Sequence, residues 1–363
     1  MKKRHTTIGL IIALLLIFIC GQAQAQDLKR FKGQKITVTC WSGPYAESFK
    51  KAFVNPFMKK SGAIIVVSPG WSEFMSKIKA SPEDKPPYDV FMADGWNYGA
   101  AMNIDRLQSI NKDNIPNAAN VYPELLKRDP WQKGYGVPLD GSAYIPVFAK
   151  GKLNFTPTSW SDLMREDMGQ KLTLDATFYY GLYAAAYISD KMPGAQELYS
   201  DEGIDHVFDI SKKLAKNVKK FYKGGAEFLS LLNTGEANMG AYYVGGTVSE
   251  MRKGANIEMV SPKEGSVSWI GYLTIMKGAK NKELAEAFIN FCLDPVQQSE
   301  YLKVSGNWVS SSKAVIPEDV KDIMPASNED FEKITFFDWD LLNAKWSEFS
   351  ERWKKEVLAQ SGK

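Results

Sequence analysis

The segment KITVTCWSGPY (Lys35–Tyr45) decides the fold class of this 363-residue chain. Its first six residues are rich in β-branched side chains and alternate in polarity, which predicts a strand. Trp-Ser-Gly-Pro then breaks the strand, and aromatic residues from Tyr45 to Phe57 recur at helical spacing. A strand, a tight turn and a helix in this order are typical of the start of an α/β domain.

The same pattern continues along the chain. AIIVVS (Ala63–Ser68) and YDVFM (Tyr88–Met92) read as further strands, and the second runs into Ala-Asp-Gly-Trp. Strands alternating with helices predict a layered α/β domain with a largely parallel sheet. Ligands of such sheets bind beyond the carboxyl ends of the strands. We therefore expect binding residues in two strand-end loops, Trp41–Tyr45 and Asp94–Tyr98.

A second α/β set follows in the middle of the chain. GVPLDGSAYIPVF (Gly136–Phe148) is an apolar run that Asp-Gly-Ser interrupts. Further strands are expected at Lys171–Leu174, which ends at Asp175, at Asn238–Val244 and at Ser266–Met276. The chain therefore has enough strands and helices for two α/β units.

The last 30 residues predict an amphipathic helix. Its apolar positions are spaced by three or four residues: Trp339, Leu342, Trp346, Phe349, Trp353 and Val357. We expect this stripe to dock on the protein's own body and its tryptophans to belong to the core. A membrane or a partner surface is the alternative.

The first 25 residues predict a secretion signal. Three basic residues at positions 2–4 precede an apolar run, residues 8–20, that is too short to span a bilayer, and Ala23–Ala25 is a small-x-small cleavage site. Cleavage after Ala25 changes the formal charge from 45 − 42 = +3 to 42 − 42 = 0. A neutral chain has no electrostatic footprint for nucleic acid. A periplasmic protein without a nucleic-acid partner is expected.

Reactive side chains are scarce. Cys40 and Cys292 remain after cleavage, and their apolar surroundings favour two buried free thiols, although an oxidising compartment also permits a bridge. His206 is the one histidine outside the signal, and no nucleophile elbow, zinc motif or phosphate loop occurs. A binding protein without cofactor or metal is expected rather than an enzyme. A secreted hydrolase or lyase using Asp94 and Asp140 is the rival class.

The order and spacing of seven blocks resemble a known family. They are Ile36–Tyr45, Pro86–Gly95, Tyr135–Asp140, Thr158–Leu163, Gly235–Gly246, Pro262–Trp269 and Lys277–Phe291. Together they resemble the extracellular solute-binding proteins of bacterial ABC importers, in particular the spermidine/putrescine-binding branch. The resemblance covers essentially the whole chain after the signal.

The resemblance implies a two-lobed periplasmic-binding-protein fold of type II. Each lobe would be a mixed, mostly parallel sheet flanked by helices, with the ligand cleft between the lobes. Lobe 1 would comprise residues 26–147 and 272–325, lobe 2 residues 148–271, and the helices of residues 326–363 would pack across both. Such a receptor closes on a small solute and presents it to a membrane permease. A monomer suits this closure.

The expected ligand-binding residues form a cation box. Aromatic side chains are expected from Trp41, Tyr45, Trp96, Tyr243, Trp269, Tyr272 and Trp308, and the resemblance places tryptophan of polyamine binders at positions 41 and 269. A bound ammonium also needs a carboxylate, for which Asp94, Asp140 and Asp175 are the candidates because each follows a predicted strand. Ser42 and Ser142 add hydroxyl groups. An organic amine or polyamine-like cation is the favoured solute.

Three features keep other solutes open. Gly271 stands where polyamine binders carry an aspartate, two residues after the tryptophan that matches Trp269. Tyr242 and Tyr243 resemble the iron ligands of ferric-binding relatives, but alternation along a strand would point their rings to opposite faces. Hydroxyl groups and helix N-termini would suit a carboxylate or phosphorylated solute.

Overall fold

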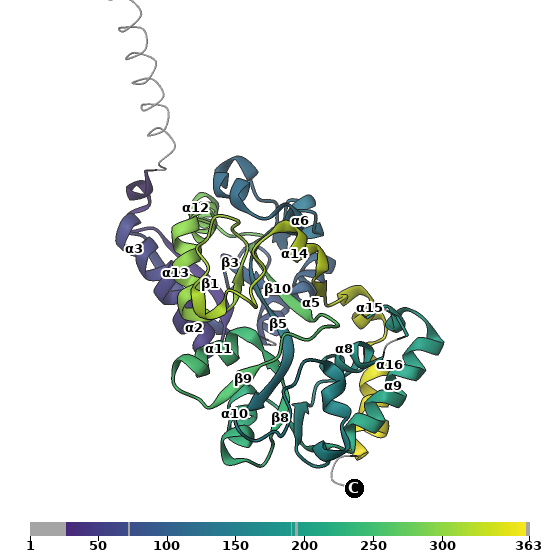
Figure 1. The fold of residues 1–363 in the computed structure, drawn as a ribbon. Helices are drawn as coiled ribbons and strands as arrows, with labels where there is room; N and C mark the ends of the chain where they lie inside the picture. The colour runs from purple at the N-terminus through teal and green to yellow at the C-terminus, as the bar shows by residue number, and fades with distance from the viewer. Residues whose placement is uncertain (1–26, 72, 190, 193–194, 361–363) are drawn as a thin grey trace, which may run out of the picture.

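The computed structural model describes residues 27–71, 73–189, 191–192 and 195–360. The predicted signal, residues 1–25, lies outside them. The described chain forms two α/β lobes joined by one mixed sheet (Figure 1). In spatial order the main strands are β2 (Ile64–Gly70), β1 (Lys35–Trp41), β3 (Val90–Ala93), β10 (Val267–Met276), β5 (Gly136–Ala149), β8 (Met239–Tyr243), β6 (Leu172–Asp175) and β7 (Val218–Tyr222).

The two longest strands carry the sheet from one lobe to the other. β1 pairs in parallel with β2 and β3, and β6 pairs in parallel with β7 and β8. Between these two groups, β10 is antiparallel to β3 and to β5, and β5 is antiparallel to β8. β5 therefore lies between the lobes (Figure 1), and its middle residues are placed beside any cleft that forms there. Four short strands pair at the margins: β4 (Leu107–Gln108), β9 (Ile257–Met259), β11 (Trp308–Val309) and β12 (Thr335–Phe336).

The helices fall into two sets around these strands. The first set packs with β1–β3: α2 (Pro44–Phe49), α3 (Asn55–Ser61), α4 (Glu73–Ala80), α5 (Gly95–Asn103), α6 (Pro123–Leu126), α7 (Asp129–Gln132), α12 (Lys282–Cys292), α13 (Pro295–Ser305) and α14 (Asn328–Lys333). The second set packs with β6–β8: α8 (Phe178–Ile188), α9 (Asp201–Ala215), α10 (Gly225–Thr234), α15 (Trp339–Ala344) and α16 (Trp346–Arg352). α11 (Val244–Arg252) lies between the two sets, where its Val244 and Val248 join the first core. No helix of the described residues is long and apolar enough to span a bilayer.

The predicted helix after β1 forms the first core. Phe49, Phe53 and Phe57 are fully buried, and Phe57 meets Phe288 of α12 edge to face, with ring centroids 5.3 Å apart. The helical spacing read from the sequence is therefore confirmed. Cys40 and Cys292 lie in the same core as buried free thiols, as predicted. Burial raises the pKa of the Cys40 thiol to about 12.

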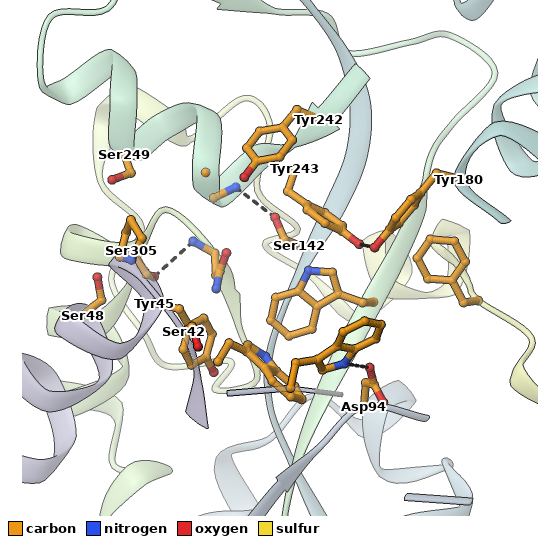
Figure 2. A pocket seen from close by; sticks show the side chains of 18 of the residues that line it. Ser42, Tyr45, Ser48, Asp94, Ser142, Tyr180, Tyr242, Tyr243, Ser249 and Ser305 are labelled. Atoms are coloured by element: carbon orange, nitrogen blue, oxygen red, sulfur yellow. Dashed lines mark hydrogen bonds between the residues drawn. The ribbon is translucent and has the colours of Figure 1, made fainter. Parts of the chain in front are cut away.

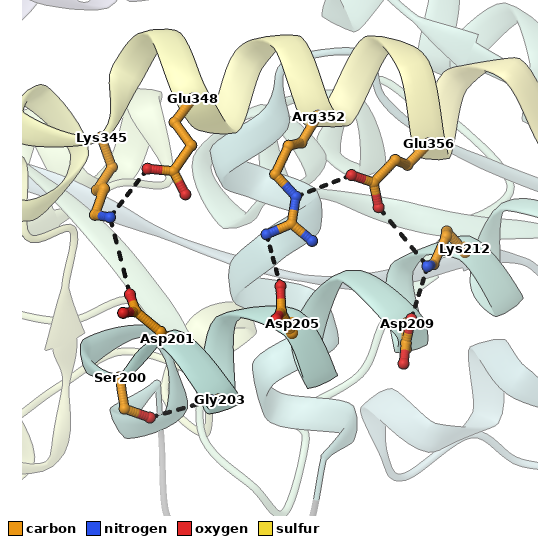
Figure 3. A network of polar contacts seen from close by, with 10 residues as sticks. All are labelled: Ser200, Asp201, Gly203, Asp205, Asp209, Lys212, Lys345, Glu348, Arg352 and Glu356. Atoms are coloured by element: carbon orange, nitrogen blue, oxygen red, sulfur yellow. Dashed lines mark hydrogen bonds and ion pairs between the residues drawn. The ribbon is translucent and has the colours of Figure 1, made fainter.

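The C-terminal stripe docks on the protein itself, as predicted. Phe349 and Trp353 are buried in the second core, and Trp353 Nε1 donates to the carbonyl of Ala176 at 3.0 Å. Surface ion pairs run beside this apolar contact, from α16 and the helical turn after it to α9 (Figure 3). Arg352 Nη1 lies 2.8 Å from Asp205 Oδ1, and Lys212 Nζ lies 3.7 Å from Glu356 Oε2. Surface ion pairs each contribute little to stability, so the buried aromatic side chains contribute most of the docking energy.

Candidate functional site

A cavity of about 460 Å³ opens between the lobes, a size that suits a small molecule. Side chains from both lobes, from β5 and β10, and from the C-terminal segment line it (Figure 2). Its lining residues are Trp41, Ser42, Pro44, Tyr45, Ser48, Gly70, Trp71, Glu73, Asp94, Ser142, Tyr179, Tyr180, Tyr242, Tyr243, Gly245, Gly246, Ser249, Trp269, Ser305, Asn307, Phe337 and Trp339.

The two strand-end loops predicted from the sequence both reach this cavity. Gly43 at φ 70° turns the chain from β1 into α2, which brings Trp41, Ser42 and Tyr45 to the carboxyl end of β1. Asp94 follows β3 and caps α5, accepting a hydrogen bond from the backbone N–H of Asn97 at 2.8 Å. The loop after β1 and the loop after β3 are therefore each held in place by the helix that follows, α2 and α5.

Asp94 is the buried carboxylate on the cavity surface. Its second oxygen accepts a hydrogen bond from Trp71 Nε1 at 2.9 Å (Figure 2). Burial raises the pKa of Asp94, and the hydrogen bonds from Asn97 and Trp71 oppose that rise by stabilising the charged form. Trp71 thus holds the carboxylate in place at the cavity edge.

Aromatic rings form the wall next to Asp94. Trp269 meets Trp41 edge to face at 6.2 Å between ring centroids and Tyr243 at 6.4 Å. The hydroxyl groups of Tyr243 and Tyr180 are hydrogen-bonded to each other (Figure 2). Burial raises the pKa of both phenols well above the ordinary value, so both stay neutral. The wall presents rings and neutral hydroxyl groups.

The charge of the lining is one-sided. Asp94 and Glu73 are its carboxylates, and among the described residues no lysine, arginine or histidine lines the cavity. Glu73 is exposed, and hydrogen bonds from its own backbone N–H and from that of Trp71 lower its pKa. The cavity therefore presents negative charge beside aromatic faces, a combination that attracts cations.

Neutral polar groups face the carboxylates from the first turn of α11 and the end of α13. Ser142 Oγ accepts a hydrogen bond from the backbone N–H of Gly245 at 2.9 Å, and Ser305 Oγ accepts one from the backbone N–H of Asn307 at 3.1 Å.

Ser142 lies in the middle of β5 and not in a break between strands, because β5 continues unbroken from Gly136 to Ala149. The Asp-Gly-Ser interruption expected from the sequence is therefore wrong.

Seven predicted residues line the cavity: Trp41, Ser42, Tyr45, Asp94, Ser142, Tyr243 and Trp269. Two predicted carboxylates do not. Asp140 is fully buried in β5, beneath Tyr45, and does not follow a strand as expected. Asp175 does end β6, but its carboxylate accepts the backbone N–H of Thr177 at 2.8 Å below α8. Burial raises the pKa of Asp175 to about 6.

Three predicted aromatic residues also lie outside the cavity lining. Trp96 faces Trp71 and Trp346 beside it, with ring centroids 6.0 and 6.4 Å away. Tyr272 is buried in the first core. Trp308 is buried too, and its Nε1 donates to Ser268 Oγ at 2.9 Å. Strand and loop position placed these rings near the cleft, but neighbouring side chains cover Tyr272 and Trp308, and the half-buried Trp96 packs against other rings.

Several lining residues were missed. Trp71 directly follows β2, and Trp41 is the last residue of β1, so the same strand-end rule would have found Trp71. Tyr179 and Tyr180 belong to α8, which is apolar on nearly all sides, so no periodicity marks the face that lines the cavity. Trp339 was expected to be core, but it lines the cavity, because α15 begins directly beside α5.

Tyr242 and Tyr243 both line the cavity, and their rings pack in different clusters, as alternation along a strand predicts: Tyr243 packs with α8 and Tyr242 with α10. β8 ends at Tyr243, and the chain turns at once into α11. Tyr242 stacks on Phe228 with ring centroids 4.9 Å apart. Among the residues the structure describes, no group of three histidine, cysteine, aspartate or glutamate side chains could hold a metal ion.

Two lobes around a polar, aromatic cavity define a receptor that encloses a small solute. The chain belongs to the family of bacterial extracellular solute-binding proteins, whose match covers residues 52–326. It is 27% identical over 269 residues to a spermidine/putrescine-binding periplasmic protein of Salmonella typhimurium, covering 72% of this chain and 74% of that protein. It is 24% identical over 330 residues to a gamma-aminobutyric acid-binding protein of Pseudomonas aeruginosa, covering 88% of each chain.

Solved structures show the same fold. A spermidine/putrescine ABC transporter substrate-binding protein from Streptococcus pneumoniae superposes with a TM-score of 0.73 at 19% identity, covering 90% of this chain and 100% of that one. The two-lobed type II fold expected from the resemblance is therefore confirmed.

Proposed function

We propose that this protein captures a small organic amine between its lobes and delivers it to the membrane permease of an ABC importer. The observation that carries the proposal is the charge of the cavity: Asp94 and Glu73 line it with aromatic rings, and no basic side chain of the described residues does. Relatives named for spermidine, putrescine and gamma-aminobutyric acid, all of which contain an amine, support this solute class.

The cavity supplies a carboxylate and aromatic faces, the two features that stabilise an ammonium group once it has lost its water. A carboxylate compensates its charge, since an unpaired buried charge is costly. Asp94 can do this while it stays fixed by Trp71. The faces of Trp41 and Trp269 add cation–π attraction of about 0.5–2 kcal/mol for each good contact. A polyvalent anion would be repelled by these carboxylates and would find no basic side chain of the described residues in the cavity lining.

The cellular setting is part of the same proposal. A signal peptide cleaved after Ala25 would release the chain into the periplasm, where relatives of this family are named as periplasmic proteins. The protein would act there as a monomer, with the solute unchanged by binding. We further propose that the chain passes between lobe 1, lobe 2 and the C-terminal helices after residues 147, 271 and 325. The two lobes would close on the solute by a hinge motion about β5 and β10.

Calorimetric titration of ligand-stripped residues 26–363 tests the solute class. Putrescine, spermidine and gamma-aminobutyric acid are compared with succinate, a sugar phosphate and ferric citrate. Binding of an amine that Asp94→Asn weakens at least tenfold supports the proposal, with Asp209→Asn on the exposed face of α9 as the charge-matched control. Binding restricted to acids, phosphates or iron overturns it. Mass spectrometry of the recovered solute detects any chemical change and so tests the hydrolase alternative.

A further inference from the structure

Asp140 does not line the cavity, but it accepts a hydrogen bond from Tyr45, which does. It is fully buried on β5, between its partner Gly271 on β10 and its partner Val309 on β11. A Cβ atom at residue 271 would lie 2.9 Å from Asp140 Oδ1, so the glycine leaves the space that the carboxylate fills.

Three donors converge on the Asp140 carboxylate. Tyr45 Oη donates at 3.0 Å, Tyr301 Oη at 2.7 Å and Asn307 Nδ2 at 3.1 Å. Among the described residues, no lysine, arginine or histidine forms an ion pair with Asp140. Burial therefore raises the pKa of Asp140 to about 7, and the three hydrogen bonds limit the rise.

Two of these donors are cavity residues, and the carboxylate fixes how they face a solute. Tyr45 gives its hydroxyl hydrogen to Asp140, so its oxygen can only accept from the cavity. Asn307 turns its amide nitrogen toward Asp140 and Tyr301, so its Oδ1 faces Gly245 at the cavity surface. A solute that meets these two oxygens must be a hydrogen-bond donor.

We infer that Asp140 is a positioning residue for specificity: through Tyr45 and Asn307 it makes one side of the cavity accept hydrogen bonds and leaves a buried negative charge for a bound ammonium to balance. The inference rests on the proposed function. Asp140 does not touch the solute. It sets the direction of two groups that do, and it adds attraction for positive charge.

The inference predicts that amine binding is linked to a proton. An ammonium favours the ionised carboxylate, so affinity should fall roughly tenfold per pH unit once the pH is below about 7. Binding at pH 7 should release protons. The titratable neighbours are Tyr45 of α2, Tyr301 of α13 and Cys40 of β1, whose pKa values burial raises. They stay neutral across this range, and Gly271 and Val309 opposite Asp140 have no titratable group.

Titration calorimetry with putrescine and with gamma-aminobutyric acid at pH 5.5–8.5, in two buffers of different ionisation enthalpy, tests this. For Asp140→Asn we expect at least a tenfold loss of affinity at pH 8, less proton release than in the wild type and a flatter pH profile. Asp94→Asn should also weaken binding but keep the midpoint near pH 7. Wild-type affinity and an unchanged profile in Asp140→Asn would overturn the inference and leave the proposed function standing. No amine binding by the wild type at any pH would overturn both.

Tyr301→Phe keeps the test decisive if Asp140→Asn does not fold. Tyr301 does not line the cavity, and its loss removes one donor from Asp140. The pKa of the carboxylate then rises, and the midpoint of the affinity profile should move to higher pH. A midpoint that does not move contradicts the inference.

Discussion

The indole of Trp339 rests on Gly95: a Cβ atom built on residue 95 would overlap Cδ1 of Trp339. This contact joins the first turn of α5 to the start of the C-terminal segment. Because Trp339 also lines the cavity, the same contact holds one wall of the site in place.

Gly95→Ala should therefore push Trp339 out of its position. We expect a loss of about 1–3 kcal/mol in the free energy of unfolding, as for other overpacked contacts, and weaker solute binding. The matched control is Gly99→Ala in the same helix, where no atom lies within 4 Å of the added methyl. This control should be neutral or slightly stabilising. Urea unfolding of both variants makes the comparison, and equal stabilities would show that the contact is absent in solution.

The solute-free protein should become more stable as the pH falls from 8 to 5.5. Asp94, Asp140 and Asp175 have pKa values raised above the ordinary 3.8, so the folded state binds more protons than the unfolded state in this range. The stabilising contributions of Asp175 and Asp140 are present at low pH and are lost as the pH rises through about 6 and about 7, and Asp94 acts in the same direction. We expect a difference of about 1–3 kcal/mol.

Asp140→Asn isolates the largest part of that effect. The variant should unfold at a higher temperature than the wild type at pH 8, and the difference should shrink toward pH 5.5. Thermal unfolding without solute measures it. A wild-type melting temperature that falls steadily from pH 8 to 5.5 would contradict the assignment of a raised pKa to these carboxylates.

The two buried thiols should be unreactive in the folded protein. Burial raises the pKa of Cys40 to about 12 and that of Cys292 well above its ordinary value, so almost no thiolate is present at neutral pH. A disulfide reagent should titrate both cysteines only after denaturation, and a reductant should not change the melting temperature. Absence of free thiols in the denatured, non-reduced protein would instead indicate a bridge.

The buried aromatics should hold the C-terminal segment more strongly than its ion pairs. Trp353→Ala should cost about 3–5 kcal/mol, because this 2%-exposed ring packs on α8 beside Gly181. Asp205→Asn removes the exposed partner of Arg352 and should cost less than about 1 kcal/mol. Denaturant unfolding compares the two. Equal losses would mean that the network in Figure 3 carries the docking.

The sequence predicted those parts of the site that depend on local order. Trp41 ends a strand, and Tyr45 and Asp94 lie in the loops after strands. The position of a strand end can be predicted from a short stretch of sequence. Asp140 shows the limit of that rule. Its strand does not end there, and the side chain lies under the cavity because β10 and β11 pair beside it, more than 100 residues later in the chain. Contacts between residues so distant in sequence leave no local pattern.

Trp339 illustrates a second limit. Its spacing with Trp346 and Trp353 correctly indicated an apolar stripe that docks on the protein. Periodicity does not say which surface a stripe meets, nor that its first residue reaches past that surface into a cavity. Gly95 leaves room for the ring of Trp339, but this role can be recognised only from the three-dimensional structure.

Because Phe337 and Trp339 belong to the cavity wall, the site depends on residues that are synthesised after all the main strands of the sheet. A nascent chain that has already formed the main strands of the sheet still lacks this side of the cavity. The solute can therefore not serve as a template during early folding. A chain truncated before residue 337 would contain both lobes but would lack part of the cavity wall. A chain can therefore bind its solute only after synthesis has passed residue 339.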